Sequence, residues 1–244
     1  MEGSKIDKTA EGGVFAYAPL FVAAAHELKS PLALVRQLAL ELEGGSVTPA
    51  QQRQIAQQIT LTNERALRLT ADLTKQARLE DSLFALEPLS PLSVCEEVVV
   101  ELRPLYKARG RSLQLGRRNG KLLGLANRDL LRRILVNFAD NALHYTQDDS
   151  PVVITVQATE GGKYIRLGVR DYGPAVPTQM WQKLKTSLGT TAQPVHARPG
   201  SSGLGIYIAG QFAEAMQARI GATRHRDGAT FYVDIATSAQ LRLL

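Results

Sequence analysis

One histidine of this sequence stands beside a glutamate on a stretch with helical spacing. The stretch is AAAHELKSPLALV, in which His26 and Glu27 are adjacent and Ser30 follows one helical turn later. A neutral imidazole is a nucleophile, and a neighbouring carboxylate can orient the ring or take its proton. Apolar residues recur on one side of the stretch and His26 falls on the other, so we expect His26 to face solvent. The alternative is a surface histidine without a role.

A second set of polar side chains lies at helical spacing in NFADNALHYT. Asn137, Asn141, His144 and Tyr145 stand at i, i+4, i+7 and i+8, which places them along one face of a predicted helix. Asparagine is a poor helix former, so two asparagines within a helix indicate a role for their amides. Amide oxygens suit Mg²⁺, whose other ligands are then phosphates and water. The alternative is a helix face that contacts water.

Two segments combine glycine with groups that suit a nucleotide. In VRDYGPAVP, Asp171 ends a predicted strand, and its carboxylate can accept a hydrogen bond from an exocyclic amine such as that of adenine; Gly173 allows close approach of the backbone to a ligand. In RPGSSGLGIYIAGQF, Gly203, Leu204 and Gly205 precede a helix whose first amides form an anion site. Taken alone, the first segment also fits a simple Asp–Gly turn.

Residues 19–83 are predicted to form two antiparallel helices that carry the histidine. Apolar residues recur at spacings of three and four, and they are Leu28, Leu32, Val35, Ala39 and Leu42 in the first helix and Ile55, Ile59, Thr62, Ala66, Leu69 and Leu73 in the second. Thr48 is a suitable N-cap of the second helix, and Pro49 suits its first position. Because one hairpin cannot bury both stripes well, we expect a homodimer in which two hairpins form a four-helix bundle.

The rest of the chain alternates helices and strands, which predicts a sheet covered by helices on one face. Helices are predicted near 94–109, 128–145 and from 203, and strands near 112–115, 122–125, 151–159, 164–171 and 229–236. Residues 174–202, rich in Gly, Pro, Ser and Thr, are predicted to be irregular. The fold class is α+β, with a flexible leader (1–18), the hairpin (19–83), a linker (84–93) and an α/β sandwich domain (94–244).

Composition narrows the classes of partner. The 244 residues carry a formal net charge of +6, which favours anionic partners, but no basic run with interleaved aromatics supports nucleic acid. The one cysteine, Cys95, excludes an internal disulfide framework and fits a reducing compartment. The longest apolar run, residues 14–25, contains Pro19 and is too short for the roughly 20 residues of a membrane span, so we expect no membrane segment.

The order of these motifs resembles the catalytic core of sensor histidine kinases over residues 20–236. HELKSPL is similar to the H-box of that family, NFADNALHYT to its N-box, DYGPAVP and SSGLG to its two glycine boxes, and GATF to the turn and strand that close the domain. The sequence departs from the pattern in four places. Ala175 replaces the second glycine usual in the first glycine box, and Ser201 stands where the second box usually begins with glycine. The segment 180–188, MWQKLKTSL, lacks the phenylalanine expected between the glycine boxes, and Ser30 stands where Thr or Asn is common.

The resemblance implies a Bergerat-type ATP-binding domain, as in gyrase and heat-shock chaperone ATPases, behind a phosphoacceptor hairpin. It implies that His26 takes the γ-phosphoryl group of ATP, with Glu27 as base, and passes it to an aspartate of a response regulator. Asn137 would hold Mg²⁺, and Ser30 would act on a water that attacks the partner's phosphorylated aspartate. The residues expected to contact the nucleotide are Asn137, Asn141, His144, Tyr145, Asp171, Gly173, Gly203, Leu204 and Gly205.

Two alternatives remain at this point. One is a pseudokinase or ATP-binding scaffold, and the other is a regulator that acts mainly as a phosphatase of a response regulator. In each case we expect a cytoplasmic location, either for the protein itself or for this part of a longer membrane-bound sensor.

Overall fold

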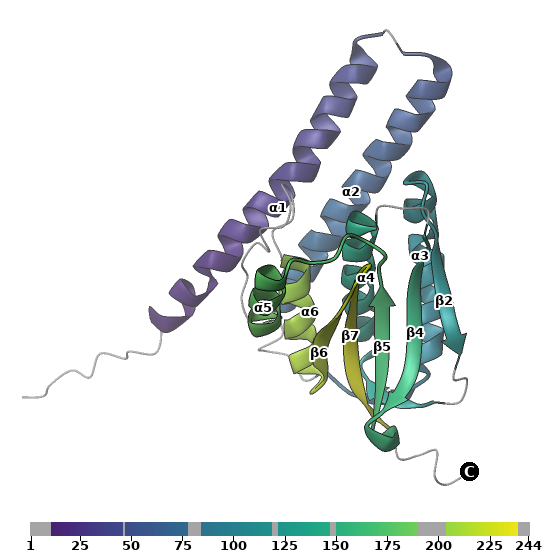
Figure 1. The fold of residues 1–244 in the computed structure, drawn as a ribbon. Coiled ribbons are helices and arrows are strands. Elements are labelled where there is room, and N and C mark those ends of the chain that lie inside the picture. Colours follow the sequence, from purple (N-terminus) through teal and green to yellow (C-terminus); the bar gives the residue numbers. More distant parts are fainter. Residues whose placement is uncertain are drawn as a thin grey trace, which may run out of the picture.

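A long helical hairpin leads into an α/β domain (Figure 1). The computed structural model describes residues 11–45, 47–77, 84–118, 122–146, 150–189 and 204–238. The helices are α1 (Glu11–Glu43), α2 (Pro49–Ala77), α3 (Pro91–Ala108), α4 (Arg128–Tyr145), α5 (Thr178–Ser187) and α6 (Leu204–Ala215), with a 3₁₀ turn at Glu160–Gly162. The strands are β1 (Glu87–Leu89), β2 (Leu113–Arg118), β3 (Gly124–Ala126), β4 (Val152–Thr159), β5 (Tyr164–Arg170), β6 (Arg219–His225) and β7 (Gly228–Thr237).

The hairpin turns where the capping residues predict. The hydroxyl of Thr48 accepts a hydrogen bond from the amide of Gln51 at 3.3 Å, and the side chain of Gln51 accepts one from the amide of Thr48 at 2.8 Å. This reciprocal pair satisfies amides that the first turn of α2 leaves without helical partners. The first helix begins at Glu11 rather than near residue 19, so Gly12 and Gly13, which favoured a flexible leader, lie within its first turn.

The second domain is built around one seven-stranded sheet. The order is β1-β3-β7-β5-β4-β2, and β6 pairs with β7; the β2–β4 pair is parallel, and the other pairs are antiparallel. Helices α3, α4 and α6 lie on one face of the sheet, which confirms the predicted fold class (Figure 1). Ile165, Leu167 and Val169 of β5 alternate toward these helices and are buried, each side chain contributing about 1.5–3 kcal/mol.

The predicted linker, residues 84–93, contains ordered elements. Strand β1 pairs with β3 alone in the sheet order, so Pro88 lies on an edge where its missing amide hydrogen is tolerated. Helix α3 begins at Pro91, before the predicted start at residue 94, because Ser90 caps it by accepting a hydrogen bond from the amide of Ser93. Two further elements were missed: α5, inside the segment predicted to be irregular, and strand β6.

Candidate functional site

The central element of the site is α4, which spans the predicted range. The side chain of Asn127 accepts a hydrogen bond from the amide of Leu130 at 3.1 Å and so caps the helix. Its apolar face is fully buried and includes Leu130, Leu131, Ile134, Leu135 and Phe138. Beside that face Asn137, Asn141 and Tyr145 are partly buried, whereas His144 is exposed. The predicted stripe therefore borders the core instead of facing solvent along its whole length.

Each of the two asparagines of the stripe has a buried amide nitrogen that finds no partner in the part of the chain that the structure describes. These atoms are the Nδ2 of Asn137 and the Nδ2 of Asn141. Buried amides in native proteins are almost always hydrogen-bonded, so a polar group that approaches here would satisfy them. This favours a ligand over the alternative of a helix face in contact with water alone.

The carboxylate of Asp171 lies at the end of β5 and is 3% exposed. Its Oδ1 accepts hydrogen bonds from the amides of Gly173 (3.1 Å) and Ala229 (3.2 Å), and Oδ2 accepts from Ala229 at 3.2 Å. Burial raises the pKa of Asp171, although these two amides and the charge of Arg170 act in the opposite direction. Because a carboxylate oxygen has two lone pairs, Oδ2 keeps the capacity to accept from a ligand amine.

Gly173, which follows β5, packs against the last residue of α4. A Cβ atom at this position would lie 2.4 Å from the carbonyl oxygen of Tyr145. The sequence predicts that Gly173 permits close approach of a ligand, whereas the close approach in the structure is to the backbone of Tyr145. The contact brings the segment that follows Asp171 beside the polar stripe of α4.

The start of α6 lies beside the other end of the stripe. A Cβ atom on Gly205 would be 3.6 Å from the Oδ1 of Asn137, an ordinary contact distance. Leu204 is buried in the core, and Gly203 lies outside the described residues. The first amides of α6 therefore lie close to Asn137, in a position where a helix N-terminus favours an anion.

The histidine pair lies on α1, which packs against the α/β domain. His26 is exposed, as predicted, and Ser30 is also exposed one turn later. Glu27 is partly buried, with an oxygen 3.8 Å from the guanidinium of Arg65 of α2. Ala24, 6% exposed, belongs to the main hydrophobic core, so the helical turn before His26 lies against that domain.

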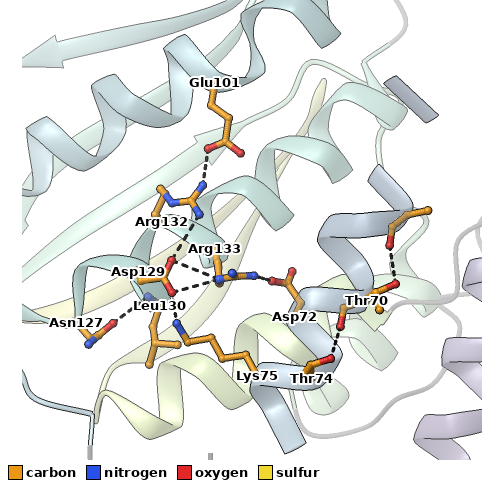
Figure 2. Close-up of polar contacts among 11 residues, drawn as sticks. Thr70, Asp72, Thr74, Lys75, Glu101, Asn127, Asp129, Leu130, Arg132 and Arg133 are labelled. Carbon is orange, nitrogen blue, oxygen red and sulfur yellow. Dashed lines mark hydrogen bonds and ion pairs between the residues drawn. The ribbon is translucent and has the colours of Figure 1, made fainter. Parts of the chain in front are cut away.

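A network of charged side chains joins α2 to α4, and motif-based reasoning missed it (Figure 2). Asp72 pairs with Arg133, Lys75 pairs with Asp129, and the Nε of Arg133 also lies 3.4 Å from Asp129. Burial raises the pKa of Asp72, against the lowering by Arg133. For Asp129, Lys75 and Arg133 outweigh burial, and its pKa is lowered.

A second group that the motifs did not indicate surrounds Asp171. Gly228, with φ of 121°, begins β7, and a Cβ atom there would lie 2.4 Å from the carbonyl oxygen of Asp171. The guanidinium of Arg170 bonds the carbonyl of Asp171 and pairs with Asp227 of the β6–β7 turn. These contacts hold the turn over Asp171. The glycine in GATF was the only sequence signal for them.

The described residues fit ATP with Mg²⁺. The Nδ2 atoms of Asn137 and Asn141 and the first amides of α6 are donors of the kind that suits phosphate oxygens, and Oδ2 of Asp171 is an acceptor of the kind that suits an amine such as that of adenine. No group of three or more His, Cys, Asp or Glu side chains able to hold a metal occurs among the described residues. A magnesium ion on Asn137 would therefore take its remaining ligands from phosphates and water.

Residues 126–238 match the family described as "Histidine kinase-, DNA gyrase B-, and HSP90-like ATPase". This range runs from the end of β3 to the residue after β7, so it contains α4, Asp171 and α6. The family match therefore covers the part of the α/β domain that holds the candidate site.

Curated relatives align over both domains. The chain is 27% identical over 216 residues to the C4-dicarboxylate transport sensor protein DctB of Rhizobium meliloti, with 86% of this chain and 33% of that protein covered. It is 26% identical over 200 residues to the histidine protein kinase SaeS of Staphylococcus epidermidis, with 80% and 56% covered. With the family match over residues 126–238, these relatives make the chain similar to the catalytic core of sensor histidine kinases. The chain spans about a third of the first relative and just over half of the second.

Solved structures show the same fold. The histidine kinase ThkA, in complex with the response regulator protein TrrA, superposes with a TM-score of 0.63 at 14% identity, covering 96% of this chain and 65% of that one. Full-length ShkA in complex with AMPPNP gives a TM-score of 0.58 at 22% identity, covering 92% and 46%. Among the described residues, no helix is long and apolar enough to cross a membrane.

Proposed function

We propose that this chain is an ATP-dependent protein-histidine kinase of a two-component system. The observation that carries the proposal is the convergence of three separate motifs: α4, the end of β5 and the start of α6 meet around Asn137 and Tyr145, in a domain whose hairpin presents His26 to solvent. Phosphoryl transfer needs mainly positioning and charge neutralisation, which such an arrangement supplies.

The first step transfers a phosphoryl group to His26. A neutral ring nitrogen of His26 attacks the γ-phosphorus of ATP, the bond to the bridging oxygen breaks, and ADP leaves. Glu27, adjacent to His26 on α1, accepts the proton that the ring loses. Magnesium on Asn137 would neutralise phosphate charge. Asp171 would recognise adenine, while Asn141, His144 and Tyr145 would contact phosphate or ribose.

The second step passes the phosphoryl group to an aspartate of a response regulator. Two findings support this step. The curated relatives are named as a histidine kinase and a sensor protein, and the complex of ThkA with the response regulator TrrA is a structural neighbour. We place the reaction in the cytoplasm, where ATP is available.

Two copies of the hairpin would form the four-helix bundle. Leu32, Leu40 and Leu67 are 59%, 55% and 61% exposed in the single chain, an unusual density of exposed leucine on two neighbouring helices. A second hairpin that covers them is the simplest partner. Sedimentation of the purified chain at a single monomer mass at all concentrations would contradict the homodimer.

Autophosphorylation of the full chain tests the proposed reaction. The chain is incubated with γ-labelled ATP and Mg²⁺, and the label should survive base and be lost in acid, as for a phosphoramidate. His26→Gln should bind ATP but incorporate no label. Lys29→Gln, which removes an exposed nitrogen three residues away on the same helix, is the matched control and should be labelled normally. Acid-stable label would indicate a hydroxyl acceptor and refute the assignment of His26.

The same experiment, repeated with the cognate response regulator added, separates the alternatives. ATP binding without any label on the unsubstituted chain would favour an ATP-binding scaffold. Faster loss of phosphate from the response regulator than its gain, with His26 labelled only slowly, would favour a regulator that acts mainly as a phosphatase.

A further inference from the structure

Helices α2 and α4 face each other in a defined antiparallel register. Arg65 of α2 lies 3.9 Å from Asp140 of α4, and further along α2 Asp72 pairs with Arg133 and Lys75 with Asp129. The step of seven residues from Arg65 to Asp72 on α2 is thus matched by a step of seven residues from Asp140 back to Arg133 on α4. Figure 2 shows the Asp72 and Lys75 contacts from one side.

This register places Arg68 opposite Asn137. Arg68 lies about midway between Arg65 and Asp72 on α2, and Asn137 lies about midway between Asp140 and Arg133 on α4. The two positions belong to the helix faces that carry the ion pairs, because the charged residues recur at spacings of three and four on both helices.

Arg68 has a buried donor without an acceptor. Its Nε is buried and finds no hydrogen-bond partner within the described ranges, and the Nδ2 atoms of Asn137 and Asn141 share this condition. Arg68 also lies close enough to Asp140 for its charge to lower the pKa of that carboxyl, against the larger raising by burial. Three orphaned donors from two facing helices indicate an absent acceptor with several oxygens.

We propose that Arg68 is a phosphate-binding residue of the ATP site, supplied by the hairpin. The inference rests on the proposed function, and it adds a cation from outside the ATPase domain to the phosphate end marked by Asn137 and the start of α6. A guanidinium suits this task because its planar donors match phosphate oxygens and it keeps its charge when buried. The ion pairs of Asp72 and Lys75 hold α2 in the register that directs Arg68 to this place.

Titration of the full chain with ATP and with adenosine tests the proposal, because only ATP carries phosphates. Arg68→Ala should weaken ATP binding by about tenfold or more, as expected for a lost charge-assisted hydrogen bond, and should leave adenosine binding unchanged. Arg68→Lys keeps the charge but not the planar donors and should restore part of the loss. Arg53→Ala, which removes an exposed arginine nearer the hairpin turn of α2, is the matched control and should bind both ligands normally.

A second variant tests the role of the register. Asp72→Asn should weaken ATP binding but not adenosine binding, and its effect should add less than fully to that of Arg68→Ala, because both act on one contact. Equal losses for ATP and adenosine in Arg68→Ala, or no loss for either, would overturn the proposal and leave Arg68 as a neutralising partner of Asp140. If the unsubstituted chain binds no ATP, the proposed function itself fails, and the role of Arg68 fails with it.

Discussion

The two glycines beside α4 should respond in opposite ways to an added methyl group. In Gly173→Ala the new Cβ would lie 2.4 Å from the carbonyl oxygen of Tyr145, whereas in Gly205→Ala it would lie 3.6 Å from the Oδ1 of Asn137. The first distance must grow by about 1 Å to reach an ordinary contact of 3.4 Å. Neither the end of β5 nor the backbone of α4 can move that far without disturbing the core.

We expect Gly173→Ala to lower the free energy of unfolding by about 1–3 kcal/mol, the usual cost of overpacking a well-packed contact. For a chain of this size the midpoint of thermal unfolding should fall by roughly 3–10 °C. Because the shift displaces the amide of Gly173 from Asp171, binding of adenosine and ATP should weaken together, by about tenfold for the loss of one hydrogen bond to a charged group.

Gly205→Ala should not destabilise the chain, because the contact is ordinary and alanine is a better helix former than glycine by up to about 1 kcal/mol. Its methyl group lies where phosphates are proposed to bind, so ATP affinity should fall while adenosine affinity stays the same. Urea unfolding and titrations with both ligands measure these quantities. If Gly173→Ala is as stable as the unsubstituted chain, the argument that this contact requires glycine is refuted.

Two further outcomes follow from the site. Burial raises the pKa of Asp171 above the ordinary 3.8, so the carboxylate should become protonated at a higher pH than an exposed aspartate, and adenosine binding should weaken there. Asp171→Asn should bind adenosine weakly at every pH. If that variant keeps the pH profile of the unsubstituted chain, Asp171 is excluded as the titrating group. Ser30→Ala should leave phosphorylation of His26 near normal and slow dephosphorylation of the response regulator; an equal fall in both rates, measured with the cognate regulator, would assign Ser30 to the helix or to docking.

Local signals predicted the elements that carry the motifs. The range of α4 was correct because Asn127 is a cap and the apolar spacing is continuous, and α2 begins where Thr48 and Pro49 indicate. Strand β6 was not predicted because its residues do not alternate between apolar and polar. They are instead suited to contacts with the neighbouring strand, β7. At Gly221 a Cβ atom would lie 2.3 Å from the ring of Tyr232 on β7, so the strand needs glycine where the pattern of a strand expects a larger residue.

The hydrogen bonds to Asp171 could not be predicted from the sequence, for a reason other than the one that applies to β6. They come from the backbone amides of Gly173 and Ala229, and any residue except proline supplies such an amide. The one feature of this arrangement that the sequence indicates is the positive φ at position 228, because glycine adopts such a φ without strain. The motif thus predicted the carboxylate but not the groups that hold it.

The docking of the hairpin shows why its register was not predictable. Charged residues at spacings of three and four on an amphipathic helix usually indicate a solvated face, and nothing in α2 alone distinguishes Asp72 or Lys75 from such a face. Apolar contacts also join the hairpin to the domain, through Leu69 and Leu73. These contacts favour proximity without selecting a register, because apolar burial is not directional. The ion pairs join particular side chains, and they therefore fix the register on which the proposed role of Arg68 depends.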